Sequence, residues 1–392
     1  MEIRLLNKDE MLHYKRLSSI AFTYSREPEK EEVKEIPANE LVYGAFDNEN
    51  LMAASVANIL PCTLNGEEVM HFGVGGVATF PEYRNRGAIK AIFNKMLKDL
   101  YDDGFVISSL MPFNHEFYRK FGYEVCYQAD TYEVPLTEFA SFNKPIKVKM
   151  VLEPENTDDF LMVYKEFTRN FGINLACTRN KESSGTEQVW GGHFTKNKAY
   201  RYVLYNENYK AESYIAFTKE NEGSFLLVNE MAFINNDALY RLFGFISGFY
   251  PHYQNLKVKL PTNILLEMLV PNAYNVKKTY PNNYMHRVIN VKKAMETLKC
   301  DLNGSFTIKI NDNQLEYNNK TFEVTFADCK VICEEAEKIA DAEMNITSFT
   351  QLISGALSLD ELILRSDVKI NNKQNFIKAV FNKKALYMRE TF

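Results

Sequence analysis

The chain has 392 residues, 46% of them apolar, and a formal net charge of −5. This length predicts two or three domains with separate cores, and the acidic balance argues against a nucleic-acid partner, because proteins that neutralise phosphates usually carry a basic excess or a basic face. No apolar run approaches the length of a membrane span, so neither a span nor a membrane partner is expected. Met1-Glu2-Ile3-Arg4 reads as the start of a strand and not as a secretory signal, which predicts a cytoplasmic protein.

The first 140 residues predict a mixed sheet with helices on its faces. A strand and a helix come first, and further strands are expected over 41–46, 51–60, 66–79 and 104–111. Turns are expected at Asp47-Asn48-Glu49-Asn50 and at Asn65-Gly66. Apolar residues at helical spacing predict a helix that begins at Ala88.

A basic turn joins the strand at 66–79 to this helix. It reads Arg84-Asn85-Arg86-Gly87 and continues into Ala88-Ile89-Lys90. The first N–H groups of a helix lack an acceptor inside the helix, and the dipole is positive at that end, so such a turn can bind a diphosphate. Arg84, Arg86 and Lys90 would add charged donors. On these residues alone, an ordinary surface turn with solvated arginines is an equal alternative.

A short helix is expected after the strand at 104–111. The segment reads Phe113-Asn114-His115-Glu116-Phe117-Tyr118-Arg119-Lys120-Phe121-Gly122-Tyr123, with Gly122 ending the helix before a further strand. By spacing alone, Tyr118 is an ordinary aromatic residue of an amphipathic helix.

The pattern begins again near residue 145. Strands are expected over 147–152, 200–205, 212–218 and 224–233, and helices over 157–171 and 236–251. The passage from Glu230 to Asp237 puts acidic residues where a phosphate would have to bind, so we expect this half to shape a substrate cleft. Trp190 is a candidate for lining that cleft, although a lone Trp more often anchors packing.

A third region begins near Met285. Short strands are expected over 305–310, 314–317 and 321–326, and helices over 347–354, 359–365 and 373–381. Residues 385–392 have an apolar, strand-like character up to Phe392. Because frayed termini are usually polar, we expect this end to be tied down.

The turn and the 113–123 segment, in this order, resemble the GNAT acetyltransferases. In that family the turn read here as Arg84-Asn85-Arg86-Gly87-Ala88-Ile89 binds the pyrophosphate of acetyl-CoA, and the Phe-Tyr-x-x-Phe-Gly-Tyr segment carries the general acid. Ile89 departs from the small residue that is usual at the third place. A bulky residue there is typical of the enhanced intracellular survival (Eis) branch of N-acetyltransferases, which the chain resembles over its whole length.

The resemblance implies an α/β fold with mixed sheets in three domains. Residues 1–140 would be the GNAT domain that binds acetyl-CoA, 141–284 a second GNAT-like domain without the CoA motif, and 285–392 a sterol-carrier-like domain that ends in the active site. Because the Eis branch forms hexamers from trimers, the resemblance also implies a homo-oligomer, either a trimer or a hexamer.

The resemblance further implies the roles of the site residues. Tyr118 would donate a proton, and the α-carboxylate of Phe392 would accept one. Acetyl-CoA would be the co-substrate, and its expected contacts are Val77, Ala78, Thr79, Arg84, Asn85, Arg86, Gly87, Ala88, Ile89, Lys90, Phe113 and Asn114.

The expected reaction is acetyl transfer from acetyl-CoA to a primary amine of a cationic small molecule, such as an aminoglycoside or a polyamine, by direct attack. An alkylammonium group must lose a proton before its nitrogen can attack, and a carboxylate can take that proton. The alternatives are a protein or peptide lysine acetyltransferase and a non-catalytic carrier of lipid or acyl-CoA. Histidines and cysteines are dispersed, so no metal is expected.

Overall fold

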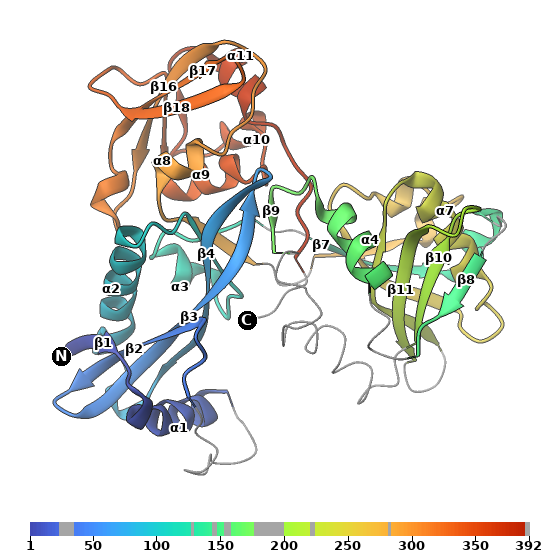
Figure 1. The fold of residues 1–392 in the computed structure, drawn as a ribbon, viewed down its shortest axis with the longest axis horizontal. Coiled ribbons are helices and arrows are strands. Elements are labelled where there is room, and N and C mark those ends of the chain that lie inside the picture. Colours follow the sequence, from blue (N-terminus) through green and yellow to red (C-terminus); the bar gives the residue numbers. More distant parts are fainter. Residues whose placement is uncertain are drawn as a thin grey trace. The chain divides into compact units, whose positions relative to one another are not determined.

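A computed structural model describes residues 1–22, 35–126, 129–142, 147–152, 158–175, 200–219, 224–280 and 284–388. The chain divides into two compact units. The first contains the described residues of 1–126 and 284–383, and the second contains those of 127–283 and 384–390 (Figure 1). Across the described residues, no helix is long and apolar enough to cross a membrane.

A mixed sheet forms the centre of the first unit. Its strand order is β1-β2-β3-β4-β5-β15-β6. The strands are β1 (Glu2–Leu5), β2 (Glu40–Asp47), β3 (Asn50–Leu64), β4 (Glu67–Thr79), β5 (Ile107–Leu110), β15 (Met285–Val288) and β6 (Glu124–Val125). β4 and β5 are parallel and the other neighbours are antiparallel. The mixed sheet expected from the sequence is therefore confirmed.

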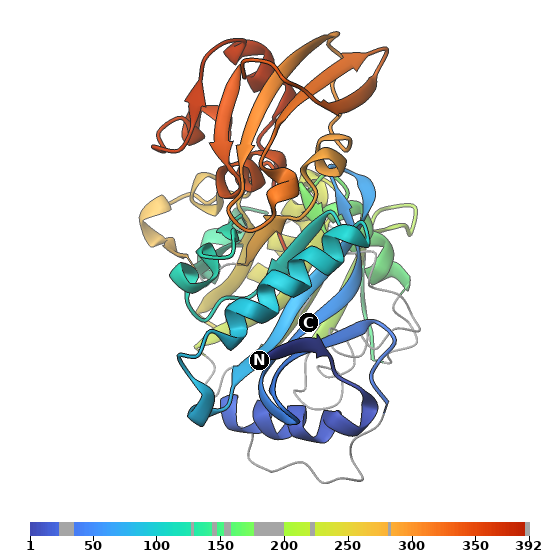
Figure 2. The same cartoon turned by 90° about the vertical axis from the view of Figure 1, so that its left-hand side faces the viewer.

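Helices cover both faces of this sheet because side chains alternate along its strands. On β2, Tyr43 and Ala45 pack against α2 (Ala88–Asp102), whereas Val42 and Phe46 pack with α1 (Met11–Ala21). Figure 2 shows α2 crossing one face. The apolar side of α2 is fully buried and consists of Ile92, Phe93, Met96, Leu97 and Leu100. Burial of each of these large side chains contributes about 1.5–3 kcal/mol to the free energy of folding.

The C-terminal region belongs to the same unit and has its own sheet, in the order β18-β17-β16-β19-β20. Its strands are β16 (Gly304–Asn311), β17 (Thr321–Ala327), β18 (Lys330–Glu335), β19 (Ala342–Asn345) and β20 (Lys369–Ile370). Its helices are α8 (Val291–Met295), α9 (Ile346–Ile353), α10 (Leu359–Leu362) and α11 (Gln374–Val380). The expected strand at 314–317 is wrong, because the Asp312 carboxylate accepts the N–H groups of Gln314 and Leu315 and turns the chain there.

The second unit is built on another mixed sheet, in the order β14-β7-β13-β12-β11-β10-β8. Its strands are β7 (Ala129–Pro135), β8 (Lys147–Met150), β10 (Tyr200–Tyr205), β11 (Ala211–Lys219), β12 (Phe225–Phe233), β13 (Asn255–Pro261) and β14 (Lys277–Thr279). This unit also contains two helices, α4 (Asp158–Thr168) and α7 (Asn236–Ser247), and the short strand β9 (Ile173–Asn174).

The sequence predicts domain boundaries at residues 140 and 284. Two strands lie on one side of a boundary but pair in the sheet on the other side. β7 precedes residue 140, yet it pairs with β13 in the second unit. β15 begins the expected third domain, yet it lies in the first sheet between β5 and β6. A strand pairs with whichever free edge the fold presents to it, and the local pattern of residues does not reveal that edge.

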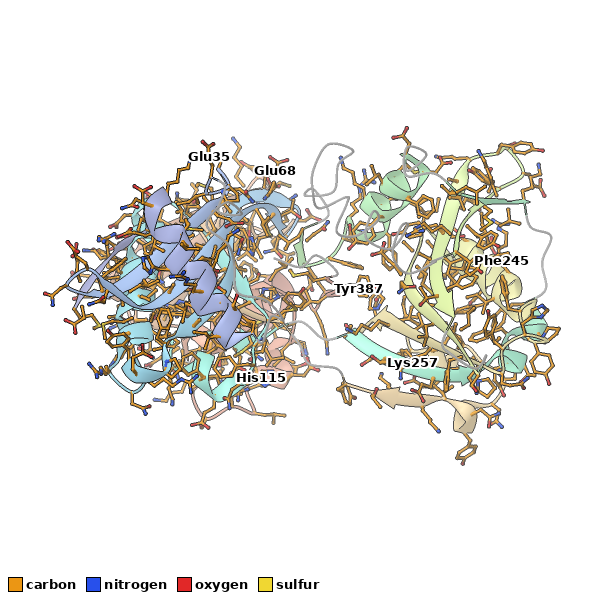
Figure 3. All side chains as sticks on the ribbon, turned by 90° about the horizontal axis from the view of Figure 1, so that it is seen from below. Glu35, Glu68, His115, Phe245, Lys257 and Tyr387 are labelled. Carbon is orange, nitrogen blue, oxygen red and sulfur yellow. The ribbon has the colours of Figure 1, made fainter. Side chains whose placement is uncertain are left out.

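The chain is tied down near its end, as expected. Leu386, Tyr387 and Met388 are buried, and the N–H of Gly172 donates to the carbonyl of Ala385 at 3.1 Å. The ring of Tyr387, labelled in Figure 3, lies 5.9 Å from the ring of Phe167. Residues 385–388 are not part of a strand, and Phe392 lies outside the described residues.

Candidate active site

The end of β4 extends past its parallel partner, β5, while its other edge stays paired with β3. Pairing with β5 ends at Val74 and Leu110, whereas β4 runs on to Thr79. On its other edge, β4 has a bulge, because Gly76 and Val77 together stand opposite Ser55 of β3. Gly76 has φ of +58°, a value that favours glycine. Within the described residues, Val77, Ala78 and Thr79 therefore have no partner on the β5 side, which leaves backbone groups there for a ligand.

The basic turn follows directly. A short 3-10 helix, η3 (Pro81–Tyr83), ends where the N–H of Arg84 donates to Pro81, and Asn85 and Gly87 then adopt left-handed φ values of 62° and 78°. The first N–H of α2 with an acceptor belongs to Ala91. Among the described residues, none accepts from the N–H groups of residues 85–90.

This row of N–H groups fits a diphosphate. It lies at the N-terminus of a 15-residue helix, where the macrodipole adds positive potential. Arg84, Arg86 and Lys90 are exposed beside it, and Ile89 is half-buried. A Cβ placed on Gly87 would meet no atom within 4 Å, so this glycine is needed for its φ and not for space. The residues present therefore suit the pyrophosphate of a nucleotide-based cofactor.

Tyr118 lies on the short helix α3 (His115–Arg119), whose first residue His115 is labelled in Figure 3. Asn114 caps this helix, since its Oδ1 accepts from the N–H of Phe117 at 3.0 Å. The Tyr118 side chain is 3% exposed, and its ring centre lies 6.2 Å from that of Phe93 on α2 and 5.5 Å from that of Phe113. Phe113 itself is exposed.

The hydroxyl of Tyr118 keeps its proton over the physiological pH range. Burial raises the pKa of Tyr118 to about 12, so the phenol stays neutral at physiological pH. Within the described residues, this hydroxyl has no hydrogen-bond partner, unlike that of Tyr123, which shares a hydrogen bond with Ser108 at 2.7 Å. A buried neutral phenol with a free O–H can serve as a general acid.

A buried hydrogen-bond network links three strands of the same sheet, and the sequence did not predict this network. Ser109 Oγ lies 2.8 Å from His71 Nε2 and 2.7 Å from His286 Nδ1. Burial lowers the pKa of each histidine to about 3, so both rings are neutral. The chain depends on β15 lying beside β5, for which the sequence carries no local signal.

At the matching place in the second unit, the described residues form no basic turn. β12 passes directly into α7, where Asn235 Oδ1 caps the helix by accepting from the N–H of Ala238 at 2.8 Å. A cavity of about 450 Å³ lies beside this junction, lined by residues that include Phe167, Phe233, Asn235 and Tyr240. The expectation that this half shapes a substrate cleft stays a prediction, and Trp190 lies outside the described residues.

No group of three or more histidine, cysteine or acidic side chains is arranged for a metal ion in the part of the chain that the structure describes.

Three family models match successive parts of the sequence. Models described as acetyltransferase (GNAT) domains match residues 2–126 and 183–288, and a sterol carrier protein domain model matches residues 291–389. β15 therefore lies at the end of the second GNAT match, although it completes the sheet of the first.

Solved structures are similar to the chain over its whole length. A probable N-acyltransferase from Enterococcus faecalis V583 has 22% identity and a TM-score of 0.83, covering 100% of this chain and 99% of that one. A GCN5-related N-acetyltransferase from Anabaena variabilis has 20% identity and a TM-score of 0.82, with 100% of both chains covered. Eis1 from Mycobacterium abscessus has 17% identity and a TM-score of 0.76, covering 100% and 99%. No curated protein sequence matches the chain.

Proposed function

We propose that this chain, a GNAT acyltransferase with an Eis-like three-domain fold, acetylates a primary amine of a cationic small molecule. The proposed acceptor is of the aminoglycoside or polyamine kind. The observation that carries the proposal is the hydroxyl of Tyr118, which has no hydrogen-bond partner among the described residues. It is buried and protonated, and its ring packs near Phe93 on α2, the helix whose N-terminus forms the anion site.

Acetyl-CoA supplies an activated acetyl group as a thioester. The N–H groups of residues 85–90, with Arg84 and Arg86, would hold its pyrophosphate, and the edge of β4 that β5 leaves open from Val77 to Thr79 would orient its acetyl carbonyl. Phe113 and Asn114 would contact it from the start of α3. The geometry of β4 past Val74 supports this arrangement, since only an unpaired strand edge leaves N–H groups free for a ligand.

The reaction requires proton transfer at two places. An alkylammonium acceptor has a pKa near 10 and must give up a proton before its nitrogen attacks. We propose that the α-carboxylate of Phe392 accepts this proton, as the resemblance to the Eis branch implies. As the C–N bond forms and the C–S bond breaks, Tyr118 would donate its proton to the departing thiolate. The proton that the nitrogen loses on becoming an amide would then pass, through solvent, back to the phenolate of Tyr118. The net charge of −5 favours a cationic acceptor. The same resemblance leads us to propose a cytoplasmic homo-oligomer, a trimer or a hexamer.

The test is CoA release over a panel of aminoglycosides, polyamines and lysine peptides. Tyr118→Phe removes only the hydroxyl, and we expect kcat to fall about a hundredfold while acetyl-CoA still binds. Tyr43→Phe is the matched control, because Tyr43 is 2% exposed and packs in the same core. Deletion of Phe392 tests the base.

The outcomes separate the alternatives. Full activity after deletion of Phe392 would remove the carboxylate from the mechanism. Preferred turnover of lysine peptides would indicate a protein acetyltransferase. Binding of acetyl-CoA with no release of CoA to any amine would favour a carrier of acyl-CoA.

A further inference from the structure

The segment that carries Tyr118 is held by side chains of the C-terminal region. Residues 118–125 are called the acid segment here, and Glu124 within it is 3% exposed. Arg119 binds Glu124 through Nε and Nη2 at 2.7–3.1 Å, and Arg365 Nη1 lies 3.5 Å from the same carboxylate. Gln351 Nε2 donates to the carbonyl of Val125 at 2.8 Å. Two side chains from the C-terminal region thus contact the end of the acid segment.

A second anchor contacts the middle of the acid segment. Arg287 on β15 is fully buried, and its Nη2 donates to both carboxylate oxygens of Asp312 at 2.9 and 2.8 Å. The same guanidinium lies against Gly122, because a Cβ there would overlap Nη1 and lie 2.8 Å from Cζ. Gly122 has φ of +80°, so the chain turns sharply at the point that Arg287 supports.

Asp312 is itself fixed in place. It follows β16 in the C-terminal region and is 3% exposed. Besides Arg287, it accepts from Asn318 Nδ2 at 3.0 Å and from the N–H groups of Gln314 and Leu315. A carboxylate with so many donors cannot shift without breaking several buried hydrogen bonds. Arg287 therefore connects the acid segment to a rigid part of the C-terminal region.

The turn at Gly122 is bonded to Tyr118 through the backbone. The carbonyl of Tyr118 accepts from the N–H groups of Phe121 at 2.9 Å and Tyr123 at 3.3 Å, and Gly122 donates to Arg119 at 3.0 Å. A shift of Gly122 would thus rotate the last turn of α3 and the phenol ring with it. Displacements of about 1 Å in a reacting group can cost on the order of a hundredfold in rate.

The interior of the C-terminal region is occupied by aromatic rings. Phe306 on β16 lies 6.4 Å from Phe326, 6.3 Å from Phe376 and 5.8 Å from Phe381, measured between ring centres. Side chains thus fill the space between β16, β17 and α11. This packing suits a rigid support more than a carrier for a lipid.

We propose that the C-terminal region is a scaffold for acetyl transfer, and that Arg287 and Arg365 are positioning residues that hold the acid segment so that the Tyr118 hydroxyl points at the leaving group. This inference rests on the proposed role of Tyr118 as the acid. It gives the sterol-carrier-like domain a part in catalysis that requires no bound lipid.

Two variants of the full-length protein test the proposal. Arg365→Gln removes one charge from a side chain that is 33% exposed, so the fold should persist. Arg287→Met with Asp312→Asn removes the buried ion pair without leaving an unpaired charge. We expect kcat to fall on the order of ten- to a hundredfold in each variant, with KM for acetyl-CoA unchanged because the turn at 84–87 is untouched. Arg4→Gln is the matched control, since Arg4 is 34% exposed and pairs with Glu10 in the same unit.

The decisive measurement repeats these substitutions in a Tyr118→Phe background. If Arg365 and Arg287 act through Tyr118, they lower kcat no further once the hydroxyl is gone. The scaffold role is overturned, while the acid role stands, in either of two cases. In the first, the substitutions lower kcat by the same factor in the parent and in the Tyr118→Phe background. In the second, the folded variants with Tyr118 intact have the same kcat as the parent. Full activity of Tyr118→Phe alone overturns the proposed mechanism instead. If the Arg287→Met, Asp312→Asn protein does not fold, Arg365→Gln decides.

Discussion

Alanine substitutions at two glycines separate a backbone cost from a packing cost. Gly87 and Gly122 have nearly the same left-handed φ, 78° and 80°. A Cβ on Gly87 would contact no other atom within 4 Å. Gly87→Ala should therefore lower the free energy of unfolding by only about 1–2 kcal/mol, which is the penalty for a non-glycine residue in the left-handed conformation. A Cβ on Gly122 overlaps Arg287, whose side chain is fully buried and held by Asp312. To move aside, the guanidinium would have to break its two hydrogen bonds to Asp312.

The added cost at Gly122 is that of disrupting a buried ion pair, about 3–5 kcal/mol. Gly122→Ala should therefore lose roughly 5 kcal/mol in all, a large part of the stability of a typical domain. Urea titrations followed by far-ultraviolet circular dichroism would compare both variants with the parent. Both positions lie in the same unit, so the same transition is measured. Equal losses at the two glycines would refute the argument that Arg287 is fixed against Gly122.

Three further results are expected. Arg84→Gln and Arg86→Gln each remove a charge-assisted donor worth about 1.5–3 kcal/mol, so each should raise KM for acetyl-CoA about tenfold or more with kcat unchanged, and an unaltered KM would contradict the anion site. The lowered pKa of His71, about 3, means that its stabilising effect is full above pH 6.5 and is lost as the pH falls toward 3. His71→Gln should thus lose less stability than the parent between pH 7 and 4 in thermal melts, whereas exposed His13→Gln should behave like the parent. The raised pKa of Tyr118, about 12, predicts a kcat that does not decline between pH 8 and 11, and a decline centred near 10 that Tyr118→Phe abolishes would contradict the raised pKa.

The local elements could be predicted because their signals are local. The helix expected from Ala88 begins there, since the apolar spacing and Gly87 define its start. The strand expected over 200–205 is also found, as β10. Likewise, the turn at 84–87 could be read as an anion site because its donors are consecutive in the chain.

Features that depend on distant pairing could not be predicted. β15 pairs with β5 although about 175 residues separate them, and neither strand has a sequence pattern that identifies its partner. Arg287, Asp312 and Gly122 meet only because of that pairing. The buried chain of His71, Ser109 and His286 is invisible for the same reason. A nonlocal contact leaves no pattern in a single sequence when its partners have no fixed spacing.

The placement of β15 also sets the order of events during synthesis. When Leu110 leaves the ribosome, the outer edge of β5 has no strand to cover it, and none arrives until Val288 has been made. At about 5–20 residues per second this interval is roughly 10–35 s. An open apolar edge is prone to intermolecular pairing for all of that time. The first GNAT sheet can thus be completed only after most of the chain has been made.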